Sequence, residues 1–354
     1  MKAIFVSNPG PAEILTISEY QQPEPAAHEL LVSVKATALN RADILQRMGK
    51  YPPPKGVAPI LGLEMAGVVE EVGSGCSGWR EGDRVCGLLP GGGYAEYVTI
   101  PAKMAIPIPE ALSFEEAAAI PEVFLTAFQA LYWLGGLSAG QSVLVHAGAS
   151  GVGTAAIQLI KEAGSNAIVT ASSAKKLDFC IKLGAKIAIN YTDGEFAKHV
   201  MEATANDGVN IILDFVGASY MAQNMSTLAT DGRLVLLATM GGAKVNQFDL
   251  MTVLRKRLQI IGSTLRARSL DYKMQLTNDF VKRILPGFAE GHFKPIVDSI
   301  YSWRQATEAH QRMEENLNMG KIILKIDDVD EPEDKSGSER SERIIISMND
   351  NDNR

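Results

Sequence analysis

The most constraining feature of this 354-residue chain is a glycine turn that follows a short apolar run. Residues Ser142–Ala147 are rich in Val and Leu, and Gly148-Ala149-Ser150-Gly151-Val152-Gly153 comes directly after them. Thr154 then opens a segment with apolar residues at helical spacing. A strand, a tight turn and a helix predict an anion site, because the first N–H groups of a helix lack partners and its dipole is positive there. The turn fits G-x-G-x-x-G with Ser150 at the second glycine position. It predicts that Ser150, Gly151, Val152 and Gly153 hold a pyrophosphate.

After this turn, strand-like and helix-like segments alternate. Lys175–Leu183 and Glu195–Ala203 have helical periodicity. The strand-like runs are Ser142–Ala147, Ala167–Ala171, Lys186–Asn190, Val209–Val216, Arg233–Ala238 and Leu258–Ile261. This alternation predicts a doubly wound parallel sheet with right-handed crossovers, over about 123–264.

The first 110 residues have a different pattern, in which short strand-like pieces recur between Gly- and Pro-rich turns. These pieces are Leu30–Leu39, Ala66–Val72, Asp83–Leu88 and Tyr94–Ile100. Closely spaced strands of this kind predict an antiparallel, partly open barrel. Towards the end of the chain we expect helices over Lys273–Phe288 and Gln305–Glu315, and a last strand over Lys321–Ile326.

Composition excludes several classes of protein. Three widely spaced cysteines (Cys76, Cys86 and Cys180) indicate a reduced, cytoplasmic compartment rather than a disulfide framework. No apolar run approaches a membrane span. The net charge of −7 argues against nucleic-acid binding, and ten acidic and four basic residues from Asp327 onward carry −6 of it. We expect this tail, 327–354, to be disordered.

The residues after the second predicted strand indicate which dinucleotide binds. An NAD site has an Asp or Glu about 20 residues past the glycines, where it accepts from the ribose 2′-OH. Here the strand ends in Ser172-Ser173-Ala174-Lys175-Lys176, with no carboxylate. Hydroxyls, helix N–H groups and lysines would instead pair with a 2′-phosphate, which favours NADP(H). Ser173 could also be a helix N-cap and the lysines a solvated face, and both interpretations can hold together.

These features, together with motifs spread over residues 1–326, resemble the medium-chain dehydrogenase/reductase superfamily, in its quinone oxidoreductase branch. The resemblance implies an α/β protein. It would have a GroES-like, partly open β-barrel catalytic domain (1–122 and 265–326) and a doubly wound Rossmann domain that binds NADP(H). It also implies a homodimer that extends the Rossmann sheets. The further motifs are Ala38–Asp43, Gly62-Leu63-Glu64-x-Ala66-Gly67, Gly82–Val85, Gly93–Tyr97, Ala117–Glu122, Leu125–Ala127 and Asn318-x-Gly320-Lys321-Ile322.

The resemblance also implies positions for the cofactor. Ser172, Lys176 and Tyr191 would surround the 2′-phosphate. The residues that would line the cofactor cleft between the two domains are Asn40, Thr126, Met240, Gly241, Leu265, Arg266 and Asn316.

No metal site is predicted. Zinc members of the superfamily take ligands from a Cys near the position of Asn40 and from the His of a Gly-His-Glu, and this chain has Asn40 and Leu63 there. Zinc needs Cys, His or carboxylate ligands at suitable spacing, and the five histidines show none. Without a Lewis acid a quinone is a favourable hydride acceptor, because its ring becomes aromatic on reduction.

The activity expected from these features is NADPH-dependent reduction of a small-molecule quinone. Tyr51, in the proline-rich loop 49–54, is the candidate proton donor, and a Tyr that only packs on this loop is an equal alternative. Asn40 is the second catalytic candidate. Asn40, Asp43 and Glu64 would form a polar network that shapes the cleft, with direct acid–base work by these residues as the lesser interpretation. Reduction of an enone or enal C=C bond is an alternative activity. A cofactor-binding structural or regulatory protein with little turnover is the alternative from another class.

Overall fold

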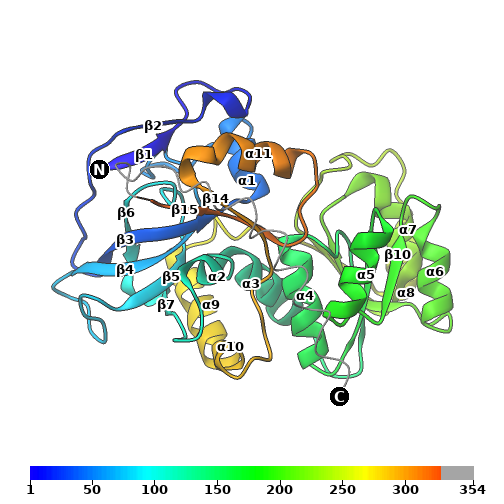
Figure 1. The fold of residues 1–354 in the computed structure, drawn as a ribbon. Coiled ribbons are helices and arrows are strands. Elements are labelled where there is room, and N and C mark those ends of the chain that lie inside the picture. Colours follow the sequence, from blue (N-terminus) through cyan, green and yellow to red (C-terminus); the bar gives the residue numbers. More distant parts are fainter. Residues whose placement is uncertain (328–354) are drawn as a thin grey trace, which may run out of the picture.

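The computed structural model describes residues 1–327 and contains two large sheets, each with its own set of helices (Figure 1). The predicted tail lies outside the described residues, apart from Asp327. One sheet has six strands and the other seven, and β1 (Lys2–Phe5) and β2 (Thr16–Glu19) form a separate antiparallel pair. The fold is α/β, with a barrel-like sheet and a parallel sheet, as the sequence predicts.

The six-stranded sheet is parallel throughout, in the order β10-β9-β8-β11-β12-β13. This order is that of a doubly wound dinucleotide-binding sheet. Its first strand, β8, lies at the centre, and successive strands are added on one side of it and then on the other. The strands are β8 (Ser142–Val145), β9 (Asn166–Ala171), β10 (Ile187–Asn190), β11 (Val209–Asp214), β12 (Leu228–Leu236) and β13 (Gln259–Gly262).

Three of the helices connecting these strands, α4, α5 and α8, begin at residues whose side chains supply missing hydrogen bonds. Ser173 caps α5, because its hydroxyl accepts from the Lys176 N–H at 3.4 Å. Asp249 caps α8 in the same way through the Met251 N–H. These helices are α4 (Gly151–Glu162), α5 (Ala174–Leu183), α6 (Phe196–Ala203), α7 (Met221–Thr227) and α8 (Leu250–Lys256).

The seven-stranded sheet has the order β14-β15-β3-β4-β5-β7, and β6 also pairs with β3. The long strand β3 is buried over most of its length and alternates only over residues 32–36, and β4 pairs with it through two register shifts that bend the sheet. The strands are β3 (Glu29–Ala38), β4 (Glu64–Val72), β5 (Arg84–Leu88), β6 (Tyr97–Pro101), β7 (Ala105–Pro107), β14 (Val297–Ser302) and β15 (Lys321–Lys325).

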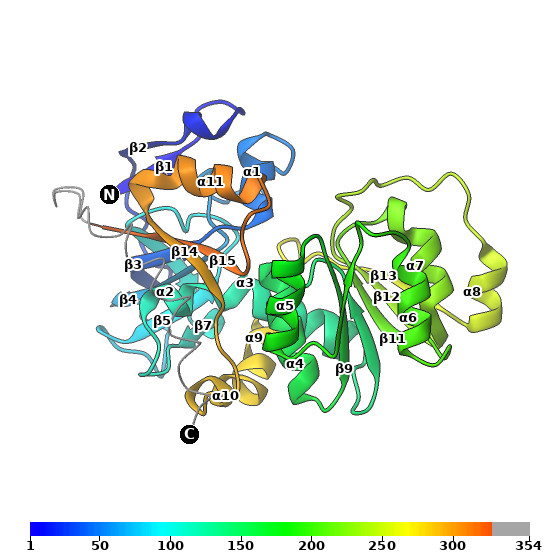
Figure 2. The same cartoon turned by 45° about the vertical axis from the view of Figure 1, so that its right-hand side comes forward.

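The remaining helices cover this sheet and join it to the other one (Figure 2). The apolar face of α3 packs against α4 and α9, and the Phe124 ring contacts the rings of Phe280, Phe288 and Phe293. One continuous core therefore runs from the barrel strands through α3 to the parallel sheet. These helices are α1 (Arg41–Arg47), α2 (Phe114–Ala118), α3 (Pro121–Phe128), the π-helical η3 (Gln129–Leu134), α9 (Leu270–Arg283), α10 (Leu285–Ala289) and α11 (Ala306–Glu314).

The structure corrects three expectations about the barrel half. The barrel is not wholly antiparallel, because β14, which we did not predict, pairs in parallel with β15. The helix expected over Lys273–Phe288 is two helices, since Pro286 has no N–H to continue the α9 ladder. The strand expected from Tyr94 begins only at Tyr97. Tyr94 is instead buried, with its hydroxyl 3.2 Å from His310 Nε2.

Candidate active site

The glycine turn takes the strand–turn–helix form that its sequence predicts. Ser150 is the N-cap of α4, and its hydroxyl accepts from the Gly153 N–H at 3.1 Å. A Cβ at Gly153 would lie 2.4 Å from the Ala147 carbonyl oxygen, so only glycine fits there. Ala147 itself is left-handed, with φ 51°. The turn thus brings the N-terminus of a twelve-residue helix, whose dipole favours an anion, to the carboxyl edge of the parallel sheet.

This turn lies directly against the start of the barrel strand β15. The Gly320 N–H donates to the Ala149 carbonyl at 2.9 Å, and Ser150 and Gly320 form an isolated parallel bridge. A Cβ at Gly151 would lie 2.8 Å from Cδ of Lys321, so the Lys321 stem packs on the first residue of α4. The predicted phosphate site and the barrel therefore share one boundary, at which the two sheets meet.

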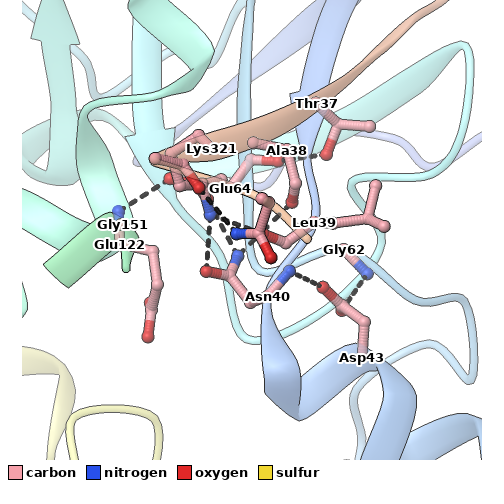
Figure 3. A network of polar contacts seen from close by, with 12 residues as sticks. Thr37, Ala38, Leu39, Asn40, Asp43, Gly62, Glu64, Glu122, Gly151 and Lys321 are labelled. Carbon is pink, nitrogen blue, oxygen red and sulfur yellow. Dashed lines mark hydrogen bonds and ion pairs between the residues drawn. The ribbon is translucent and has the colours of Figure 1, made fainter. Parts of the chain in front are cut away.

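A buried polar network extends from this boundary into the barrel (Figure 3). Lys321 Nζ lies 2.8 Å from Glu64 Oε1 and donates to the Leu39 carbonyl and, at 2.7 Å, to Asn40 Oδ1. Asn40 Nδ2 donates to the same Glu64 oxygen at 2.8 Å. Glu64 is fully buried and Lys321 nearly so. Asn40 thus stands between a buried anion and a buried cation, with both its amide atoms committed.

Two further carboxyl groups surround this ion pair. Asp43 accepts from the N–H groups of Asn40 (2.8 Å) and Gly62 (3.0 Å), and burial raises its pKa to about 6 against the effect of those bonds. Glu122 donates its backbone N–H to Glu64 Oε2 at 2.8 Å. Desolvation, and then the Glu64 carboxylate, raise the pKa of the Glu122 side chain to about 8.

Thr126, Arg266 and Tyr51 lie near this network. The Thr126 hydroxyl and Nη1 of Arg266 are buried without a hydrogen-bond partner among residues 1–327. The other Arg266 nitrogens donate to the Pro90 carbonyl and to Gln46 Oε1, both at 2.8 Å. The Arg266 guanidinium carbon lies 5.1 Å from the centre of the Tyr51 ring, and burial lowers the Arg266 pKa. Two polar atoms at predicted cofactor positions therefore have unused hydrogen-bonding capacity.

Of the residues predicted around a 2′-phosphate, Lys176 lies where the two halves of the chain touch. Lys176 Nζ donates to the Asn316 carbonyl at 2.6 Å, and the Asn316 side chain accepts from Arg41 at 2.6 Å. Ser172 is exposed at the end of β9. Tyr191 is also exposed, with its ring 6.3 Å from that of Tyr220.

Met240 and Gly241 are held against the end of β11. Their N–H groups donate to the carbonyls of Phe215 (3.1 Å) and Val216 (2.7 Å). A Cβ at Gly241 would lie 2.4 Å from Ser219 Oγ. Met240 is largely exposed, whereas Leu265 is buried.

A buried chain of hydrogen bonds fixes the loop that follows β11. Asp214 accepts from the Val216 N–H at 2.6 Å and from Asn224 Nδ2 at 3.0 Å. Asn224 Oδ1 lies 2.8 Å from His146 Nε2, and His146 Nδ1 lies 3.0 Å from the Thr170 hydroxyl. Burial lowers the His146 pKa to about 4, so the ring is neutral. His146 is thus a packed, hydrogen-bonded residue.

Sequence reasoning did not single out Lys321 or Glu122 as site residues. Both stand inside motifs that carry the family resemblance, but no spacing rule links Glu64 to a lysine 257 positions later. A surface hollow of about 620 Å³ between β7 and α9 includes none of the predicted site residues. Within residues 1–327, no group of three or more His, Cys, Asp or Glu side chains could hold a metal ion. None of the helices in that part of the chain is long and apolar enough to cross a membrane.

Comparison with known proteins identifies the family. Residues 26–110 match the alcohol dehydrogenase GroES-like domain, and residues 151–282 match the zinc-binding dehydrogenase family. The quinone oxidoreductase of Rattus norvegicus is 30% identical over 327 residues, which cover 92% of this chain and 97% of that protein. The chain belongs to the medium-chain dehydrogenase/reductase superfamily, in the quinone oxidoreductase branch. It is an oxidoreductase of that superfamily with the fold of a nicotinamide-dependent enzyme.

Other relatives carry different names. The synaptic vesicle membrane protein VAT-1 homolog of Homo sapiens is 33% identical over 319 residues, covering 85% of this chain and 80% of that protein. A mycobacterial structure complexed with NADPH is 29% identical, with a TM-score of 0.82, over 92% of this chain and all of that one. The enoyl reductase CurK is 28% identical, with a TM-score of 0.81, over 92% of this chain and 99% of that one.

Proposed function

We propose that the protein is an NADPH:quinone oxidoreductase that transfers hydride from the nicotinamide to a quinone, without a metal, between a GroES-like domain (1–122 and 265–326) and a Rossmann domain (123–264). The observation that carries the proposal is the shared boundary of the two halves. There the phosphate-binding turn at Ser150–Gly153 lies against the Glu64–Lys321–Asn40 network. Quinone oxidoreductases among the relatives support the reaction class.

The residues present fit a nicotinamide dinucleotide. The N-terminus of α4 would hold the pyrophosphate through Ser150, Gly151, Val152 and Gly153. The unpartnered Thr126 hydroxyl is available to the nicotinamide half, with Asn40, Met240, Gly241, Leu265 and Arg266 around it. Bound there, NADPH would supply the hydride.

We propose that Ser172, Lys176 and Tyr191 bind the 2′-phosphate and that Asn316 lines the cofactor cleft next to them. Because no carboxylate stands at the end of β9, nothing there would repel a phosphate. Lys176, whose ammonium already reaches across to the Asn316 carbonyl, supplies the positive charge. The relative solved with NADPH supports this choice of cofactor.

The acceptor is proposed to be a quinone because the position of a zinc ligand is taken by Asn40, whose amide atoms are committed to Lys321 and Glu64. A quinone needs little electrophilic help, so the chain's task is to orient the reactants and exclude water. Tyr51, stacked on Arg266, is proposed to lie at the mouth of the site, where its phenol could donate a proton.

We further propose a cytoplasmic homodimer. Several exposed apolar side chains belong to α8 and the loop before it, next in sequence to the edge strand β13. Figure 2 shows α8 at the right-hand end of the molecule. Leu250 and Leu254 are each 71% exposed. An unpaired edge with an apolar helix beside it favours association of two copies.

Two other functions use the same site. Reduction of an enone or enal needs the same hydride geometry, and CurK, an enoyl reductase, shares the fold. A structural or regulatory protein would bind the cofactor with little turnover, and one relative is named as a synaptic vesicle membrane protein rather than as an enzyme.

The experiment that separates these functions is a titration of the purified protein with NADPH and NADH by fluorescence, followed by addition of 1,2-naphthoquinone or an enone. The proposal requires preferential NADPH binding and saturable NADPH oxidation with the quinone. Turnover with the enone alone would establish the first alternative. Binding without turnover on any acceptor would favour the second.

A further inference from the structure

We propose that Glu122 is a catalytic residue of this site and delivers the proton that accompanies hydride transfer. The inference rests on the proposed reductase function and adds a residue to which neither the sequence motifs nor the relatives assign a role. It is argued from the face of α3 on which Glu122 lies, the contacts that fix its backbone, the uncommitted state of its carboxyl and the charges around it.

Glu122 lies on the least buried face of α3, although its carboxyl is still largely shielded from water. Pro121, Val123–Leu125, Ala127 and Phe128 are buried, whereas Glu122 and Thr126 keep intermediate exposure. Residues four apart lie one above the other on a helix, so Glu122 and Thr126 share a face. Val123, next to Glu122, is one of the side chains that a Cβ at Gly151 would strike. The first turn of α3, which carries Glu122, therefore lies beside the start of α4, where the pyrophosphate is predicted.

The backbone of Glu122 is fixed while its side chain is free. Its N–H donates to Glu64 Oε2, which ties the first turn of α3 to the buried ion pair. Its carboxyl, in contrast, forms no hydrogen bond or ion pair with any residue in 1–327. Figure 3 shows the Glu122 side chain leaving the network and pointing away from Glu64, with no dashed contact at its end. Asp43 and Glu64 accept several hydrogen bonds each and have no such freedom.

The groups that face Glu122 from the surrounding elements keep this carboxyl protonated at neutral pH. Desolvation is the largest effect, and the carboxylates of Glu64 on β4 and Asp43 on α1 add to it. Lys321 on β15 and Arg266, in the segment after β13, lower the Glu122 pKa. Their effect is smaller than the combined effect of desolvation and the two carboxylates. The resulting pKa of about 8 is that of a group able to donate near physiological pH and to recover its proton from water.

The quinone would accept a hydride, which bound NADPH would supply on oxidation to NADP⁺, and would become the hydroquinone monoanion. The O–H bond of Glu122 breaks and its proton forms an O–H bond on the anionic oxygen, which gives the neutral hydroquinone. Solvent then reprotonates the Glu122 carboxylate. Tyr51 need not ionise, and its stacking on Arg266 is compatible with a purely packing role.

The test compares wild type with Glu122→Gln, which keeps the size of the side chain and removes its acidity. The variant should bind NADPH, followed by fluorescence, within about twofold of wild type. Its kcat with 1,2-naphthoquinone at pH 7 should fall about 100-fold, the range for loss of a general acid. Wild-type kcat should decline above about pH 8, and this decline should be absent from the variant. Glu122→Asp should retain part of the rate. Glu110→Gln, an exposed residue of the same half, is the matched control and should behave as wild type.

A readout independent of turnover is the infrared absorption of protonated carboxyl groups across a pH titration. Wild type should show a carboxyl band that disappears near pH 8, and Glu122→Gln should lack it. The inference is overturned if the variant keeps wild-type kcat and its alkaline decline, if the band persists in the variant, or if kcat falls only together with NADPH binding. If wild type itself oxidises no NADPH with quinones or enones, the proposed function fails as well, which is a separate result from an active Glu122→Gln.

Discussion

Replacing Lys321 with Met tests whether the buried ion pair holds the boundary between the two sheets together. Lys321 is 3% exposed and its ammonium lies within 2.8 Å of Glu64 Oε1, Asn40 Oδ1 and the Leu39 carbonyl. Methionine keeps most of the length of the stem that packs on Gly151, so the change removes mainly the charge and its three contacts.

The size of the effect follows from the burial of the partner. Glu64 has no exposure, so its carboxylate would lose its cation without gaining water. Removing one member of a buried ion pair costs about 3–5 kcal/mol of unfolding free energy, because the remaining charge is uncompensated. Here the Asn40 amide and the Glu122 N–H still donate to Glu64, which places the expected loss at the lower end, about 3 kcal/mol.

The assay is guanidinium unfolding followed by tryptophan fluorescence. Trp303 is fully buried in the cluster that includes Ile322 and Leu324, so it reports on the environment of β15. Lys325→Met is the matched control, since Lys325 lies on the same strand and its ion pair with Asp327, at 3.7 Å, is partly exposed. That change should alter stability by less than about 1 kcal/mol.

A double variant tests whether Glu64 and Lys321 stabilise the protein as one pair. Glu64→Gln with Lys321→Met contains neither charge and should be at least about 1 kcal/mol more stable than the sum of the two single losses predicts. A loss below about 1 kcal/mol for Lys321→Met, or strict additivity in the double variant, would refute the view that Glu64 and Lys321 act as one buried pair.

Three further predictions follow from the structure. Burial lowers the pKa of His146 to about 4 and that of His310 to about 3, below the ordinary 6.5. The two neutral histidines should therefore make their full contribution to the free energy of unfolding above pH 6.5, and this contribution should fall as the pH drops towards 4. The expected loss is about 3 kcal/mol for His146 alone, and urea unfolding at pH 7.5 and 4.5 would measure it. Lys176→Ala should weaken NADPH binding about 10-fold, as expected for one charge-assisted hydrogen bond, and leave NADH binding within twofold; equal losses for both in fluorescence titrations would contradict a 2′-phosphate contact. Leu254→Glu should convert the proposed dimer to a monomer in light scattering, and an unchanged mass would remove α8 from the interface.

Local pattern was enough for most of the parallel half. The glycine turn, the apolar runs and the hydroxyl caps are each encoded within a few residues, because strand periodicity, helix capping and left-handed turns are short-range effects. Hence the six strands lie within a few residues of their predicted bounds, and Ser150 and Ser173 are N-caps. Strand β14 was missed since Val297-Asp298-Ser299-Ile300 has no clear alternation, and its parallel partner β15 is more than 20 residues away.

The candidate site also has some features that depend on local sequence and others that depend on tertiary packing. The sequence alone determined the strand–turn–helix form of the glycine turn and the lack of a carboxylate after β9, because both depend on neighbouring residues. Only the tertiary structure brought Glu64 to Lys321, placed Val123 of α3 against Gly151, and left Arg266 with a nitrogen that has no partner among residues 1–327. The physical reason is that burial sets the energies of these charges. Burial depends on which distant segments pack around a side chain, and no local spacing in the chain specifies that.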